Sequence, residues 1–202
     1  MSDLWIFDND GTLYSDGLAY AQFRDLLLGY LPSIRGIDET GKKQLIAALK
    51  NKTAITSTLF ALHRENGLDF DETIAATCLQ IDLDKCQLLS PDLERRQVLE
   101  SIPAEKVVFT NNASAYALRV LRYIGLDACF SRIIGVQETG GLSKPDHEAF
   151  QFVHELFPGH DRKFFCDDKR EFLDVALEFG WHTIWYRPLA DSQSNSSPHR
   201  VI

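Results

Sequence analysis

Two aspartates close together near the start of the chain are the first residues with evident chemistry. Asp8 and Asp10 directly follow the apolar run Leu4–Phe7, within "WIFDNDGTLY". A buried carboxylate is costly unless it is paired with a cation or binds a metal ion. The rest of the chain must therefore bring compensating charges to this pair.

Polar residues follow apolar runs at other places too. These are Thr110, Asn111 and Asn112 in "KVVFTNN", Asp167 and Asp168 in "KFFCDD", and Lys144 in the loop "ETGGLSKPDH". In an open parallel sheet, ligands bind outside the carboxyl ends of the strands. We therefore expect these side chains to meet Asp8 and Asp10 at one edge of a sheet.

Such a set of residues favours phosphoryl chemistry. Clustered carboxylates are suited to Mg²⁺, a hard cation that prefers oxygen ligands. Asp8 would be a carboxylate nucleophile that forms an aspartyl-phosphate. Asp10 would protonate the leaving oxygen and later deprotonate water.

Other groups at the same edge are suited to holding the phosphoryl oxygens. We expect this role for the Thr110 hydroxyl and for the backbone N–H groups that follow Asp8 and Thr110, which belong to Asn9 and Asn111. Lys144 would supply positive charge where negative charge develops. Asn112 is interpreted as a turn or capping residue.

The elements that must position these residues are short strands and helices in alternation. The expected strands are Leu4–Phe7, Lys106–Asn112, Ser131–Val136, Lys163–Asp168 and His182–Tyr186. Their apolar runs lack alternation, which is typical of parallel strands buried on both faces. Helical patterns separate the last four. The sequence thus predicts an α/β fold with a doubly wound, Rossmann-like parallel sheet.

A long helical segment interrupts this pattern after the first strand. Residues 15–99 contain amphipathic stretches such as "GLAYAQFRDLLLGYL" and lack a convincing strand. We expect a helical insert over residues 15–99, an α/β core over 1–14 and 100–190, and a flexible, Ser-rich tail over 191–202.

Composition narrows the range of partners. The formal net charge of −8 disfavours a nucleic acid polymer or an acidic membrane, but not a small anionic metabolite. The four cysteines form no CxxC pair or Cys/His cluster, so reduced thiols in the cytoplasm are the simpler expectation. Neither a signal peptide nor a membrane span is expected. The sequence predicts no oligomeric state.

The motifs also resemble those of a known family. "FDNDGTLY", "FTNN", "SKP" and "FCDD" look like the four motifs of haloacid dehalogenase-like phosphatases, in the same order. The helical insert resembles the cap of that superfamily's first subclass. Within the superfamily, the motifs look most like the pyrimidine 5′-nucleotidase-like branch.

The resemblance implies further roles for particular residues. It makes the backbone carbonyl of Asp10 a metal ligand and Asp168 the main second-site ligand, with Asp167 beside it or acting through water. It also shows one departure: relatives in this branch commonly have a small hydroxyl residue and an asparagine where this chain has Lys169 and Phe172.

The predicted function is a Mg²⁺-dependent phosphohydrolase for a small phosphomonoester, with a pyrimidine nucleoside 5′-monophosphate as the substrate the resemblance favours. Tyr14, Tyr20 or Phe23 would stack on the base. The alternatives are a phosphatase for phosphoglycolate or a sugar phosphate, and a non-catalytic homologue that binds a phosphorylated ligand. A phospho-accepting receiver domain is disfavoured because it needs no long insert. Hydrolysis of a haloacid is disfavoured because halide departure needs no acid such as Asp10.

Overall fold

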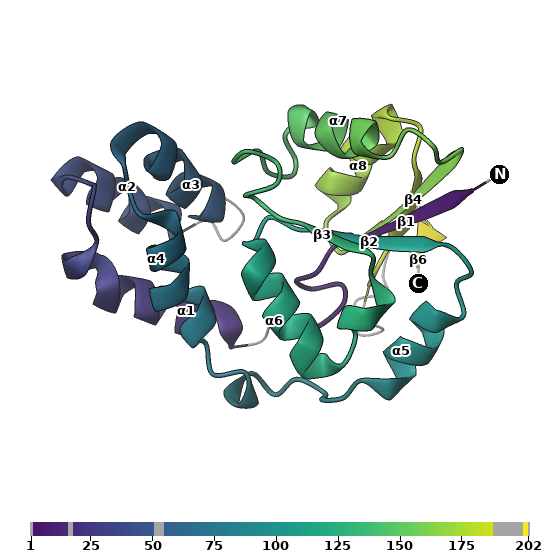
Figure 1. Cartoon of the computed structure of the whole chain (residues 1–202), viewed down its shortest axis with the longest axis horizontal. Coiled ribbons are helices and arrows are strands. Elements are labelled where there is room, and N and C mark those ends of the chain that lie inside the picture. The colour runs from purple at the N-terminus through teal and green to yellow at the C-terminus, as the bar shows by residue number, and fades with distance from the viewer. Residues whose placement is uncertain (1, 16–17, 51–54, 188–199, 202) are drawn as a thin grey trace.

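The computed structural model describes residues 2–15, 18–50, 55–187 and 200–201. Within these residues the strands form one parallel sheet in the order β3-β2-β1-β4-β5-β6 (Figure 1). The strands are β1 (Asp3–Phe7), β2 (Glu105–Phe109), β3 (Arg132–Ile134), β4 (Arg162–Asp167), β5 (His182–Trp185) and β6 (Arg200–Val201). The predicted α/β fold is confirmed.

Helices cover both faces of the sheet. Helices α7 (His147–Leu156) and α8 (Arg170–Glu178) lie on one face, and α5 (Leu93–Glu100) and α6 (Ser114–Ile124) lie on the other (Figure 1). Because successive side chains of a strand point to opposite faces, Leu4 and Ile6 join the core under α7 and α8. Burial on both faces explains why the strand sequences are apolar without alternation.

The segment after β1 forms a separate group of helices, located beyond one end of the sheet in Figure 1. It contains α1 (Ala19–Tyr30), α2 (Glu39–Ala48), α3 (Ile55–Asn66) and α4 (Phe70–Ala76), followed by the short 3₁₀ helix η2 (Cys78–Gln80). Leu27, Leu45 and Leu59 of this group are fully buried, and they belong to the same apolar cluster as Val108 of β2 and Val120 of α6. Among the described residues, no helix is both long and apolar enough to cross a membrane.

Helix α5 lies with the core, although the expected helical insert extended to residue 99. The backbone N–H of Asp92, which caps α5, donates to the carbonyl of Ile124 over 2.9 Å. The Arg95 guanidinium donates to the Leu13 carbonyl and, over 3.4 Å, to the Tyr186 hydroxyl. These contacts place α5 with the core, so the helical insert ends before Leu93 and not at residue 99.

The chain end differs from the predicted flexible tail at two residues. Arg200 and Val201 form β6, which pairs in parallel with Ile184 and Trp185 of β5. The prediction was therefore wrong for these two residues, and residues 191–199 and 202 lie outside the described part of the chain. The physical reason is that the outer edge of β5 would otherwise leave its backbone groups unpaired, and the backbone of a short segment can pair with them as a strand.

Candidate active site

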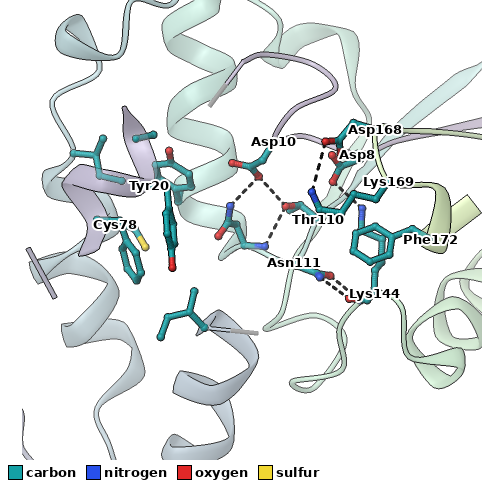
Figure 2. Close-up of a pocket in the computed structure, with 16 residues that line it drawn as sticks. Asp8, Asp10, Tyr20, Cys78, Thr110, Asn111, Lys144, Asp168, Lys169 and Phe172 are labelled. Atoms are coloured by element: carbon teal, nitrogen blue, oxygen red, sulfur yellow. Dashed lines mark hydrogen bonds and ion pairs between the residues drawn. The ribbon is translucent and has the colours of Figure 1, made fainter. Parts of the chain in front are cut away.

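The carboxyl ends of three adjacent strands bring the predicted residues together. Because β1 lies between β2 and β4, Asp8 after β1 is flanked by Thr110 after β2 and by Asp167 at the end of β4. Figure 2 shows Asp8, Thr110, Lys144 and Asp168 at one site. Segments far apart in the sequence thus supply one constellation.

Lys144 is the cation at the centre of this constellation. Its Nζ donates to Asp8 Oδ1 and to Asp167 Oδ2, each over 2.7 Å. Burial would lower the pKa of Lys144, but the carboxylates of Asp167 and Asp8 outweigh it and raise that pKa. Burial raises the pKa of both aspartates, and their attraction to Lys144 opposes this rise. The lysine is therefore held as an ammonium group between two carboxylates.

Aromatic rings surround the same ammonium group. The ring centroids of Phe109, Phe165 and Phe172 lie 5.2, 5.3 and 5.1 Å from Nζ of Lys144. A cation near the face of an aromatic ring is attracted by the ring's quadrupole. Phe172, where relatives were expected to have an asparagine, therefore contacts the lysine through its ring instead of an amide.

The side chain of Asn111 fixes the loop that carries Lys144. Its Nδ2 donates to the Lys144 carbonyl and its Oδ1 accepts from the Lys144 N–H, each over 2.7 Å. The amide oxygen and one N–H of the amide of Asn111 are therefore engaged in holding this loop.

Two backbone N–H groups remain for an anion. Within the described residues, neither Asn9 N–H nor Asn111 N–H has a hydrogen-bond partner. The side chain of Asn9 is fully buried and donates to Asp10 Oδ2 over 3.4 Å. The side chain of Asn9 is therefore not placed to contact a substrate.

The acidic residues fit a hard divalent cation. Asp8, Asp167 and Asp168 each offer a carboxylate oxygen within 4.8 Å of the others. Both oxygens of Asp167 already accept hydrogen bonds, from Lys144 Nζ and from the backbone N–H of Lys169 over 2.8 Å. Oδ1 of Asp168, in contrast, is buried without a partner. An all-oxygen set with one unsatisfied carboxylate oxygen is suited to Mg²⁺.

Asp10 lies in a network of its own. Its Oδ2 accepts from Thr110 Oγ1 over 3.3 Å and from Asn112 Nδ2 over 2.8 Å (Figure 2), and its Oδ1 accepts from the Tyr14 hydroxyl. Our sequence interpretation missed Asn112 as a site residue. Its position two residues after Thr110, at the same strand end, was the available signal.

Tyr14 is a buried hydrogen-bond partner of Asp10, which its position in the sequence did not indicate. It is only 3% exposed and does not line the pocket that contains Tyr20 and Phe23, so of the three expected rings only those two are placed to stack on a substrate base. A turn closed by Gly11 N–H and the Tyr14 carbonyl, 2.8 Å apart, brings Tyr14 back toward Asp10. Its hydroxyl also lies 3.3 Å from that of Tyr116 on α6.

Gly11 permits this turn to pass close to Asp168. Its φ of +97° is in the left-handed region, which glycine adopts without strain. A Cβ at this position would lie 2.6 Å from Asp168 Oδ2. The glycine of "DNDG" is therefore required by both backbone conformation and space.

A pocket connects this site with the helical insert. Its walls on the core side include Asp8, Asp10, Thr110, Lys144, Asp168 and Lys169. Its walls on the insert side are Ala19, Tyr20, Phe23, Ile55, Cys78 and Ile81. The cavity therefore lies where the insert meets the carboxyl edge of the sheet.

A doubly wound sheet with carboxylates and a buried lysine at its carboxyl edge defines an α/β protein with a ligand site at the strand ends. The family model described as haloacid dehalogenase-like hydrolase matches residues 3–162. The chain belongs to this family of hydrolases, as its motifs predicted. None of the curated proteins is significantly similar to it in sequence.

Solved structures agree with this fold. YfnB from Bacillus subtilis, determined with bound magnesium, has a TM-score of 0.62 and 22% identity, over 100% of this chain and 94% of its own. A 2-haloacid dehalogenase from Pseudomonas syringae has a TM-score of 0.58 and 22% identity over the same shares. A subfamily IA hydrolase from Geobacter sulfurreducens has a TM-score of 0.53 and 21% identity, over 92% and 87% of the two chains. At these identities the likeness establishes the shared fold.

Proposed function

We propose that this hydrolase removes phosphate from a small phosphomonoester through an aspartyl-phosphate on Asp8. The observation that carries the proposal is the position of Asp10. Its carboxylate is held by Thr110 and Asn112 over 3.3 and 2.8 Å, between the Lys144 site and the insert side of the pocket (Figure 2). An acid in this place is suited to a leaving group that departs as an oxygen and needs a proton.

In the first step, a carboxylate oxygen of Asp8 attacks phosphorus and the bond from phosphorus to the leaving oxygen breaks. Asp10 gives its proton to that oxygen, so the product leaves as an alcohol. Lys144 and the N–H groups of Asn9 and Asn111 stabilise the charge on the phosphoryl oxygens.

In the second step, Asp10 takes a proton from a water molecule. The resulting hydroxide attacks phosphorus, the bond between phosphorus and Asp8 breaks, and inorganic phosphate is released. Asp10 thereby regains the proton that it gave away, and Asp8 regains its carboxylate.

Asp8 and Asp168, with Asp167 and the Asp10 carbonyl close by, are the residues that would hold Mg²⁺. The buried, unpartnered Oδ1 of Asp168 supports this assignment. When bound, Mg²⁺ supplies charge neutralisation and polarises a phosphoryl oxygen.

The helical insert is proposed to act as a cap that excludes water and selects the substrate. Its residues form one wall of the pocket. Within this class of reaction, we propose nucleoside 5′-monophosphates as substrates, with pyrimidines favoured over purines. The free cysteines agree with a reducing cytoplasm as the location of the enzyme.

A substrate panel with phosphate release as the readout tests this proposal. The values of kcat/KM for UMP, CMP, AMP, GMP, phosphoglycolate and a hexose phosphate are to be compared. If phosphoglycolate or the hexose phosphate leads by more than about tenfold, the nucleotidase assignment falls and the phosphatase chemistry stands.

Dehalogenation is the competing reaction, because a 2-haloacid dehalogenase shares the fold. Release of chloride from 2-chloropropionate, without phosphate release from any phosphomonoester, would favour it. A chain that binds phosphorylated compounds without releasing phosphate would be the non-catalytic homologue.

A further inference from the structure

The pocket has two chemically different ends. Figure 2 shows Asp8, Lys144 and Asp168 at one end, Tyr20 and Cys78 at the other, and Asp10 between them. Every charged side chain that lines the pocket comes from the core, within the part of the chain that the structure describes. The charged end is suited to a phosphoryl group, so the other end must receive the leaving group.

The insert end is neutral and mostly apolar. Tyr20 and Phe23 of α1, Ile55 of α3 and Ile81 form most of its wall. The rings of Tyr20 and Phe23 lie 6.3 Å apart, tilted by 31°. The hydroxyl of Tyr20 is engaged, because it donates to the Leu49 carbonyl over 2.6 Å.

The remaining polar group at this end also stays neutral. Burial raises the pKa of the Cys78 thiol to about 12, so at neutral pH the thiol carries no charge. The cations that line the pocket, Lys144 and Lys169, are both already close to acids, at 2.7 Å from Asp8 and 3.6 Å from Asp168. A second anionic group on a ligand would therefore be desolvated at the insert end without a partner.

We propose that the enzyme selects monoesters whose leaving group is uncharged and carries a flat apolar part, seated against Tyr20 and Phe23. This inference rests on the proposed phosphatase function. It disfavours phosphoglycolate, whose carboxylate would face the apolar wall. It also disfavours hexose phosphates, whose hydroxyl groups would find few hydrogen-bond partners there.

Two pairs of esters with matched size test the inference. Propyl phosphate and phosphoglycolate differ mainly in charge, and benzyl phosphate and glucose 6-phosphate differ mainly in polarity. We expect kcat/KM to be at least about tenfold higher for the neutral or apolar member of each pair. p-Nitrophenyl phosphate reports the phosphatase chemistry itself.

A positive charge placed in the apolar wall should change the substrate preference in favour of an anionic leaving group. Tyr20→Lys should lower KM for phosphoglycolate and raise KM for benzyl phosphate. Leu28→Lys is the matched control, because Leu28 lies on the same helix but is 42% exposed and does not line the pocket. This control should leave both KM values unchanged.

The outcomes separate the two proposals. If phosphate is released but the charged or hydroxyl-rich member of either pair is used as well as its partner or better, the leaving-group inference is wrong and the phosphatase proposal stands. An unchanged preference in Tyr20→Lys also contradicts the inference. If no ester, including p-nitrophenyl phosphate, releases phosphate in the presence of Mg²⁺, both proposals fail.

Discussion

The ring of Phe172 lies against the ammonium group of Lys144, with 5.1 Å between the ring centroid and Nζ. Such contacts contribute about 0.5–2 kcal/mol. Phe172→Leu should therefore lower kcat by about 2- to 30-fold, because the lysine loses one of its supports. Phe157→Leu, which truncates a buried ring outside the site, is the control for a general loss of packing. Equal kcat values in the two variants at similar melting temperatures would contradict a positioning role for Phe172.

Asp8 is expected to be indispensable for turnover. Asp8→Asn removes the nucleophile but keeps the shape of the side chain. The lost attraction to Lys144 is offset because a charge is no longer buried and the repulsion from Asp10 and Asp168 is relieved. We therefore expect loss of phosphate release with a melting temperature near that of the wild type. Retention of more than about a few per cent of the activity would show that another group attacks phosphorus.

The hydrogen bond from Tyr14 to Asp10 should matter most when the leaving group needs a proton. Tyr14→Phe should slow hydrolysis of an alkyl phosphate by about tenfold, because a hydrogen bond to a charged group contributes about 1.5–3 kcal/mol, of which only part is lost. p-Nitrophenyl phosphate, whose leaving group is stable as an anion, should be affected much less.

Tyr116→Phe is the matched control for this comparison, since the Tyr116 hydroxyl contacts that of Tyr14 but has no hydrogen bond to Asp10. An equal loss for both ester types in Tyr14→Phe would indicate a structural role only.

Phosphatase activity should depend on a divalent metal ion, because Asp8, Asp167 and Asp168 form an acidic cluster. A chelator should abolish activity, Mg²⁺ should restore it, and Ca²⁺ should support it poorly, because its larger and looser coordination shell would misplace the nucleophile. Full activity in excess EDTA would exclude a role for a metal.

A second readout does not depend on activity. Mg²⁺ should raise the melting temperature of the wild type, because a ligand that binds only the folded state stabilises it. Asp168→Asn should remove this rise, whereas Glu171→Gln, an exposed acid in the first turn of α8, should keep it.

The cysteine at the insert end should be unreactive in the folded protein. With a pKa of about 12, the Cys78 thiol is protonated at pH 8, and the thiolate is the form that reacts with iodoacetamide. We expect mass spectrometry to find Cys78 unlabelled in the native protein and labelled after denaturation. Labelling at the rate of an exposed thiol would show that the pocket is open to solvent at this position.

Much of the fold was predictable because burial on both faces leaves a clear mark in a strand. Apolar runs such as "VVF" and "FFC", each followed by polar residues, identified the strands and their carboxyl ends. The end of the helical insert and strand β6 were not predictable. The sequence of α5 has the same amphipathic pattern whether the helix packs on the core or on the insert, so it does not show to which of the two the helix belongs. A pair of residues becomes a strand only when an edge such as β5 is available.

For the site, the sequence by itself determined which residue types stand at the strand ends, including Asp8, Thr110, Lys144 and Asp168. The tertiary structure alone decided how they are used. Asn111 supports the lysine loop, Asn112 and Tyr14 hold Asp10, and a phenylalanine ring replaces an expected amide beside Lys144. The physical reason is that a side chain's role depends on which partner lies within hydrogen-bonding or packing distance. That partner is set by the packing of segments distant in the chain.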